Sequence, residues 1–68
     1  MNGLKESREK AGLSQQALAD MLHINQAQIA RFELGNIGVF SNFVLRQIGQ
    51  ALNVSVDFLL NGKEFEKK

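Results

Sequence analysis

The sequence predicts a compact all-α domain, a bundle of five short helices. Apolar residues recur at the three- and four-residue spacing of a helix face, and no segment alternates with the two-residue period of a strand. Serine or asparagine precedes each of these segments, glycine or asparagine ends most of them, and proline is absent. We expect one domain over residues 1–62, followed by a charged tail over 63–68.

The composition excludes several classes of protein. There is no cysteine, so neither a disulfide framework nor a thiolate metal site is expected, and one histidine argues against a histidine metal cluster. We therefore predict no metal and no cofactor. No apolar run approaches membrane-spanning length and the N-terminal residues do not resemble a signal peptide, so a cytoplasmic location without membrane association is expected. The net charge of +1 gives no strongly basic face.

The first predicted helix begins after Asn2, whose side chain is suited to cap it. Gly12 closes this helix in the left-handed conformation. Its inward face carries Leu4, Ser7, Arg8 and Ala11.

The next two helices are separated by only a few residues. Ser14 caps a helix over 15–22, which carries Leu18, Met21 and Leu22 on one face. Asn25 caps a helix over 26–34, which ends at Gly35 and turns Ile29 and Phe32 inward. Asn25 and Gln28 have the spacing of a capping box. The methyl side chain of Ala19 allows close approach where the two helices cross.

The remaining helices follow an uncharged loop over 36–40. Ser41 caps a helix with an apolar face that ends at Asn53, and Ser55 caps a last helix over 56–60 that ends before Gly62. The predicted core is Leu4, Leu13, Leu18, Leu22, Ile29, Phe32, Leu45, Ile48, Leu52, Val54 and Leu59.

Residues 15–34 thus form a helix-turn-helix unit, which presents its second helix to a DNA major groove. The segments 12–19 (GLSQQALA) and 51–60 (ALNVSVDFLL), with Phe32, Glu33 and Gly35, resemble the phage lambda repressor and Cro family, also called Xre-type. The resemblance covers roughly residues 4–60. It implies a five-helix repressor-like fold, operator binding as a homodimer, and no catalysis. His23 stands where the family usually has glycine, and the loop over 36–40 lacks the family's basic residues.

The resemblance also implies roles for individual residues. Gln26, Ala27 and Arg31 occupy the family's base-reading positions, and their side chains suit adenine, thymine methyl and guanine respectively. In this family, a glutamine at the position of Gln15 contacts a DNA phosphate and can brace a glutamine at the start of the DNA-reading helix. Here that second glutamine would be Gln26. For Gln28, capping and DNA contact are equally favoured. The full predicted DNA-binding set is Gln15, Asn25, Gln26, Ala27, Gln28, Arg31 and Asn36.

Two structural roles follow from the same match. Arg8 is expected to pair with Glu33 and so position the recognition helix. Phe58, Leu60 and Phe65 exceed the needs of a small core and are predicted to form a homodimer interface at the last helix. Val39 and Phe40 are expected to pack against the fourth helix or a second subunit. We interpret His23 as a turn residue rather than a pH switch.

The predicted function is a DNA-binding transcriptional regulator, a repressor that binds double-stranded DNA at a palindromic operator as a homodimer. The alternative is an antitoxin-like module that also binds a protein partner, which the low net charge and the apolar loop favour. An enzyme is disfavoured, because no arrangement of nucleophile and base is apparent in the sequence.

Overall fold

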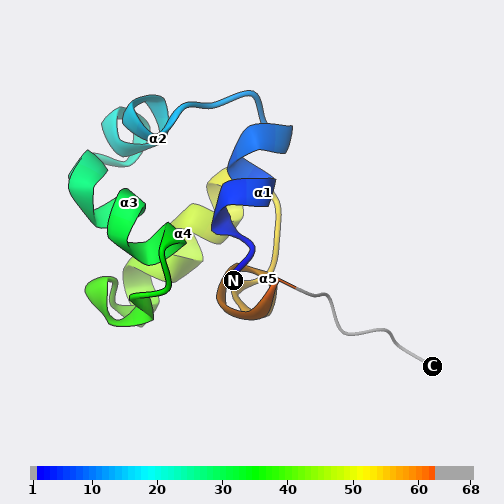
Figure 1. The fold of residues 1–68 in the computed structure, drawn as a ribbon. Coiled ribbons are helices and arrows are strands. Elements are labelled where there is room, and N and C mark those ends of the chain that lie inside the picture. The colour runs from blue at the N-terminus through cyan, green and yellow to red at the C-terminus, as the bar shows by residue number, and fades with distance from the viewer. Residues whose placement is uncertain (1, 63–68) are drawn as a thin grey trace.

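The computed structural model describes residues 2–62, and the predicted tail lies outside them. Five α-helices confirm the predicted all-α fold: α1 (Leu4–Lys10), α2 (Gln15–Leu22), α3 (Gln26–Glu33), α4 (Asn42–Leu52) and α5 (Val56–Asn61). A short 3-10 turn, η1 (Ile37–Val39), occupies the loop before α4. Figure 1 shows α2 and α3 on one side of the molecule, with α1 and α5 packed together on the other. Among the described residues, no helix is long and apolar enough to cross a membrane.

The predicted serine and asparagine caps are confirmed for four helices. The side-chain oxygens of Ser14, Asn25, Ser41 and Ser55 each accept a hydrogen bond from a backbone N–H in the first turn of the following helix. Gly3 rather than Asn2 is the N-cap residue of α1, but the Asn2 side chain does accept from the first N–H of this helix, as predicted. Asn2 Oδ1 accepts from the Leu4 N–H at 3.2 Å, and Asn2 Nδ2 donates to the Phe32 carbonyl at 2.6 Å, which ties the N-terminal segment to α3.

His23 holds the left-handed conformation expected at the turn between α2 and α3, with φ of 58°. A side chain with a Cβ pays about 1–2 kcal/mol for this conformation. Glycine avoids that cost but loses about 0.5–1 kcal/mol through the entropy of the unfolded chain.

We therefore expect His23→Gly to raise the free energy of unfolding by about 0.5–1 kcal/mol, because relief of the Cβ clash exceeds the entropic loss. Chemical denaturation of the two proteins measures the difference. His23→Ala is the control, since it removes the imidazole but keeps the Cβ, and it should not stabilise. A lower stability for His23→Gly would mean that the imidazole makes contacts that matter more than the backbone strain.

Most residues of the predicted core are buried in the structure, but several residues predicted to face inward are not. Leu13, Leu22 and Val54 are only partly buried, and Met21, predicted on the inner face of α2, is 48% exposed. Ala11 at the end of α1 is exposed as well. Ala19 is fully buried, as expected for a small residue between two helices. Phe40 joins the core, where its ring lies 5.4 Å from that of Phe32. Phe40 therefore packs against α3 of its own chain and does not require a second subunit.

The end of α4 is packed tightly against the turn that leads to α5. Gly49 is buried, and a Cβ at this position would lie 2.7 Å from the carbonyl oxygen of Val54. The Val54 N–H donates to the Gly49 carbonyl at 2.9 Å, so the same turn is held in place by a backbone hydrogen bond. Because the obstructing atom belongs to the backbone, it cannot rotate away.

We expect Gly49→Ala to lower the free energy of unfolding by about 1–3 kcal/mol through overpacking. Helix propensity alone predicts the opposite sign, a gain of about 1 kcal/mol. Thermal and denaturant unfolding decide between the two. Gln50→Ala, one residue further along the same helix and exposed, is the matched control and should change stability by less than about 0.5 kcal/mol. A variant as stable as the wild type would show that the turn yields.

Candidate nucleic-acid interface

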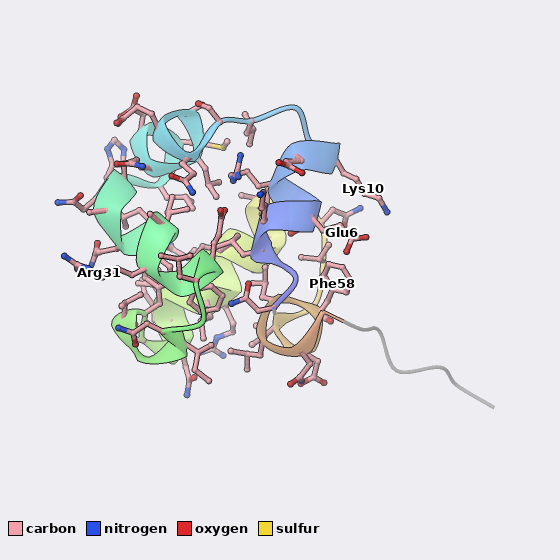
Figure 2. The ribbon with its side chains drawn as sticks, in the orientation of Figure 1. Glu6, Lys10, Arg31 and Phe58 are labelled. Carbon is pink, nitrogen blue, oxygen red and sulfur yellow. The ribbon has the colours of Figure 1, made fainter. Side chains whose placement is uncertain are left out.

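The outer face of α3 carries the predicted base-reading side chains. Ile29 and Phe32 are completely buried and fix which face of α3 points inward. Gln26 and Ala27 are half-buried on the other face, and Arg31 is exposed. Figure 2 shows Arg31 pointing away from the body of the molecule, on the opposite side from Glu6, Lys10 and Phe58. The exposed side of α3 therefore combines an amide, a methyl group and a guanidinium.

A buried ion pair fixes α3 to α1, as predicted. Arg8 Nε donates to Glu33 Oε2 at 2.7 Å and Arg8 Nη2 donates to Glu33 Oε1 at 3.3 Å. A third donor, Arg8 Nη1, reaches the Leu13 carbonyl at 2.7 Å. The two side chains are only 8% and 6% exposed. The hydrogen bond to Glu33 raises the pKa of Arg8, although burial acts in the opposite direction, so the guanidinium stays charged.

Gln15 connects this ion pair to the start of α3. Its Nε2 donates to Glu33 Oε1 at 2.8 Å, and its Oε1 accepts from Gln26 Nε2 at 2.6 Å. The expected brace between Gln15 and Gln26 is therefore present. The sequence did not predict the bond from Gln15 to Glu33, because no residue pattern reports that these side chains meet. One continuous chain of hydrogen bonds joins Gln26, Gln15, Glu33 and Arg8.

The capping box at the start of α3 is also present. Asn25 Oδ1 accepts from the Ala27 N–H at 2.9 Å, and Gln28 Oε1 accepts from the Asn25 N–H at 3.2 Å. Gln28 thus has the capping role, and its DNA role stays a prediction. Asn36 is exposed at the start of η1, close to the C-terminal end of α3. Its backbone N–H donates to the Arg31 carbonyl at 3.0 Å.

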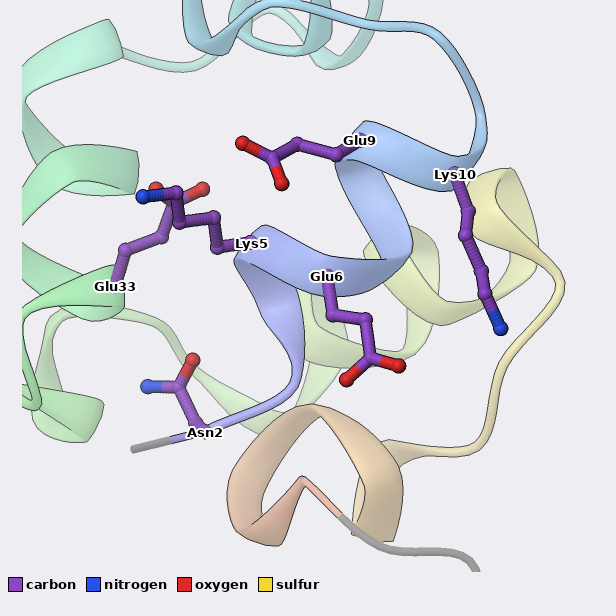
Figure 3. A pocket seen from close by; sticks show the side chains of 6 residues that line it. All are labelled: Asn2, Lys5, Glu6, Glu9, Lys10 and Glu33. Carbon is purple, nitrogen blue, oxygen red and sulfur yellow. The ribbon is translucent and has the colours of Figure 1, made fainter.

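A shallow hollow of about 500 Å³ runs along α1 and is bordered by Glu33 of α3 (Figure 3). Its lining mixes charges of both signs: Asn2, Lys5, Glu6, Glu9, Lys10 and Glu33. Glu6 and Lys10 lie on the opposite side of the molecule from Arg31, so this hollow is separate from the exposed face of α3. Among residues 2–62, no cluster of three or more acidic or histidine side chains has an arrangement suited to a metal ion.

The helix order and the helix-turn-helix geometry agree with a comparison against protein-family models. The model of the family described as Helix-turn-helix matches residues 4–59 of the chain. The chain belongs to the Xre-type family of the lambda repressor and Cro. No solved structure matches the chain. As a member of the Xre-type family, the protein is a DNA-binding transcriptional regulator, and the family is regulatory rather than enzymatic.

In the part of this Xre-type domain that the structure describes, the apolar side chains exposed most are not the ones predicted to form its dimer interface. Phe58 and Leu60, predicted at a dimer interface, are only half-exposed. Phe58 lies over Gly3, and Leu60 packs against the core. Phe65 lies outside the described residues. Among residues 2–62, the most exposed large apolar side chains lie elsewhere: Met21, Leu34, Ile37 and Phe43. Leu34, the C-cap residue of α3, is 87% exposed, as expected for a residue three positions after Arg31 on the outer face.

Proposed function

We propose that the protein is a sequence-specific repressor that acts in the cytoplasm and binds a palindromic operator as a homodimer. The observation that carries this proposal is that Gln26 and Arg31 both lie on the outer face of α3, where Gln15 holds Gln26 in place through a hydrogen bond. Repression would be steric, because a dimer seated on its operator excludes polymerase from the same DNA.

The side chains of α3 support direct reading of base edges. The Gln26 amide matches the donor and acceptor of adenine, and the Arg31 guanidinium matches the two acceptors of guanine. The methyl group of Ala27 fits the thymine methyl. Arg31 is also the only lysine or arginine between residues 15 and 34, so few phosphates are neutralised at this surface. Uncharged donors and backbone N–H groups must make most of the backbone contacts.

An electrophoretic shift against the promoter DNA of the protein's own gene, repeated over a series of salt concentrations, tests this function. We expect a specific complex whose affinity falls only shallowly with salt, because few lysine and arginine side chains displace counterions. A nonspecific mixed-sequence duplex is the control. Equal binding to both duplexes, or to neither, would contradict sequence-specific regulation.

The dimer must place both copies of α3 on one side of the DNA, about 34 Å apart. Phe58 faces away from Arg31, so an interface centred on Phe58 would lie behind the DNA-reading face (Figure 2). Leu60 instead borders a hollow of about 300 Å³ shared with Ile37, Asn2, Gly35 and Asn61. Ile37 is 48% exposed. We therefore place the dimer contact at the end of α5 and at η1, with Leu60 and Ile37 at its centre.

Sedimentation with and without operator tests the dimer. We expect wild-type protein to be a weak dimer in free solution and a firm one on a palindromic duplex, because two linked reading helices combine their affinities. Ile37→Ser and Leu60→Ser should lower occupancy of the full palindrome more than that of a single half-site. Phe58→Ala is the comparison variant for an interface at the middle of α5. A single copy bound to a full palindrome would contradict the dimer.

A second candidate function is a module that also binds a protein partner. The observation that favours it is the uncharged segment from residue 34 to residue 45, which exposes Leu34, Ile37 and Phe43. An apolar surface of this kind commonly marks an interaction site. If Leu34→Ser and Phe43→Ser leave DNA binding and dimerisation unchanged but abolish regulation in cells, the protein-partner function gains support.

A further inference from the structure

The chain of hydrogen bonds behind α3 has a direction. A carboxylate paired with a guanidinium carries no proton, so Glu33 only accepts hydrogen bonds. The group that Gln15 turns toward Glu33 must therefore be its Nε2, as the 2.8 Å bond shows. The Oε1 of Gln15 is then the atom left to face Gln26.

The same reasoning fixes Gln26. An amide oxygen accepts and does not donate, so Gln26 must turn its Nε2 toward Gln15, at 2.6 Å. Of the two hydrogens on that nitrogen, one is used inward. Gln26 is left with its Oε1 and a single N–H for the DNA.

This remaining pattern discriminates between the purines. Adenine offers one donor and one acceptor in the major groove, which one acceptor and one N–H satisfy. Guanine offers two acceptors, N7 and O6, which require two donors. If the Gln26 amide were inverted, both of its hydrogens would face the DNA. The Gln15 amide would then invert as well and turn its oxygen toward the Glu33 carboxylate, and two acceptors cannot form a hydrogen bond.

We propose that Glu33, acting through Gln15, sets the orientation of the Gln26 amide and thereby makes the protein select adenine over guanine. Glu33 and Gln15 are positioning residues in this role, since the contact with the base is made by Gln26. The inference rests on the proposed reading of DNA by α3. It adds that the choice of purine depends on a buried charge that does not touch the base.

Selection from a randomised duplex library identifies the preferred sequences, and the position at which Gln26→Ala loses its preference is the one read by Gln26. Dissociation constants are then measured for duplexes with adenine or guanine at that position. We expect wild type to prefer adenine by about tenfold or more, as a good bidentate contact allows. Gln15→Ala should bring the ratio close to one while the Arg8–Glu33 pair remains intact. Glu33→Gln, which lets Gln15 invert, should also reduce the ratio.

Gln16→Ala is the matched control, because Gln16 is the neighbour of Gln15 on α2 and its side chain donates to Asp20 Oδ1 at 2.8 Å, away from Glu33 and Gln26. It should keep the wild-type ratio. A Gln15→Ala variant that binds more weakly overall but keeps the full preference for adenine would overturn the proposal, since a role limited to affinity or folding leaves the ratio unchanged.

Side-chain amide NMR spectra of the free protein separate failure of this inference from failure of the proposed function. We expect Gln26 to show one amide proton shifted by its hydrogen bond, and expect Gln15→Ala to remove that shift. Shifted amide resonances in a protein that reads no sequence would reject the DNA function and the purine selection but retain the hydrogen-bonded chain. Unshifted Gln26 resonances would overturn the inference even if specific DNA binding is found.

Discussion

Arg8→Ala is expected to lower the free energy of unfolding by about 3–5 kcal/mol, the cost of leaving a buried partner charge uncompensated. The carboxylate of Glu33 would keep its hydrogen bond from Gln15 but lose both bonds from Arg8. The Leu13 carbonyl would lose its donor as well. A small domain has a total stability of about 0.05–0.15 kcal/mol per residue, so a loss of this size leaves much of the protein unfolded.

Denaturant unfolding followed by circular dichroism measures this loss. Arg46→Ala is the matched control, because Arg46 is exposed on α4 and its removal should change stability by less than about 0.5 kcal/mol. Replacing both partners, as Arg8→Met with Glu33→Leu, should restore much of the stability, since no charge is then left buried. A loss below about half a kcal/mol for Arg8→Ala would show that water reaches Glu33.

The positions of the helices follow from local signals in the sequence. Ser14, Asn25, Ser41 and Ser55 stop the chain from extending each helix backward, because their side chains take the first free N–H groups. These are contacts between residues two or three positions apart, so the order of residues is enough to predict them. Asn2 also has a distant partner, the Phe32 carbonyl, which the order of residues could not predict.

The details that depend on packing between distant segments could not be predicted in the same way. Phe40 and Phe58 look alike in the sequence, yet Phe40 packs on Phe32 whereas Phe58 stays half-exposed over Gly3. The bond between Gln15 and Glu33 joins residues 18 positions apart and depends on how α2 crosses α3. The family resemblance predicted the Arg8–Glu33 pair and the contact between Gln15 and Gln26. Only the three-dimensional structure shows the bond from Gln15 to Glu33 that joins these two contacts.

Arg31→Ala is expected to weaken specific DNA binding by about 1–3 kcal/mol, because the variant loses a bidentate contact with guanine. Gln26→Ala should cost a similar amount through the loss of the adenine contact. Arg31 is exposed, so folding should be unaffected. Footprinting titrations on the selected operator measure both affinities, and Arg31→Ala should also relax the base preference at one operator position.

Two controls separate base reading from general attraction to phosphate. Arg31→Lys keeps the charge but loses the planar fork of donors, so it should relax specificity nearly as much as Arg31→Ala while nonspecific binding is retained. Lys10→Ala removes a cation on the opposite side of the molecule from Arg31 and should leave the specific affinity unchanged. If Arg31→Ala and Gln26→Ala both protect the operator at wild-type concentrations, α3 does not read the DNA. The exposed segment around Leu34 and Phe43 would then be the surface to test with a protein partner.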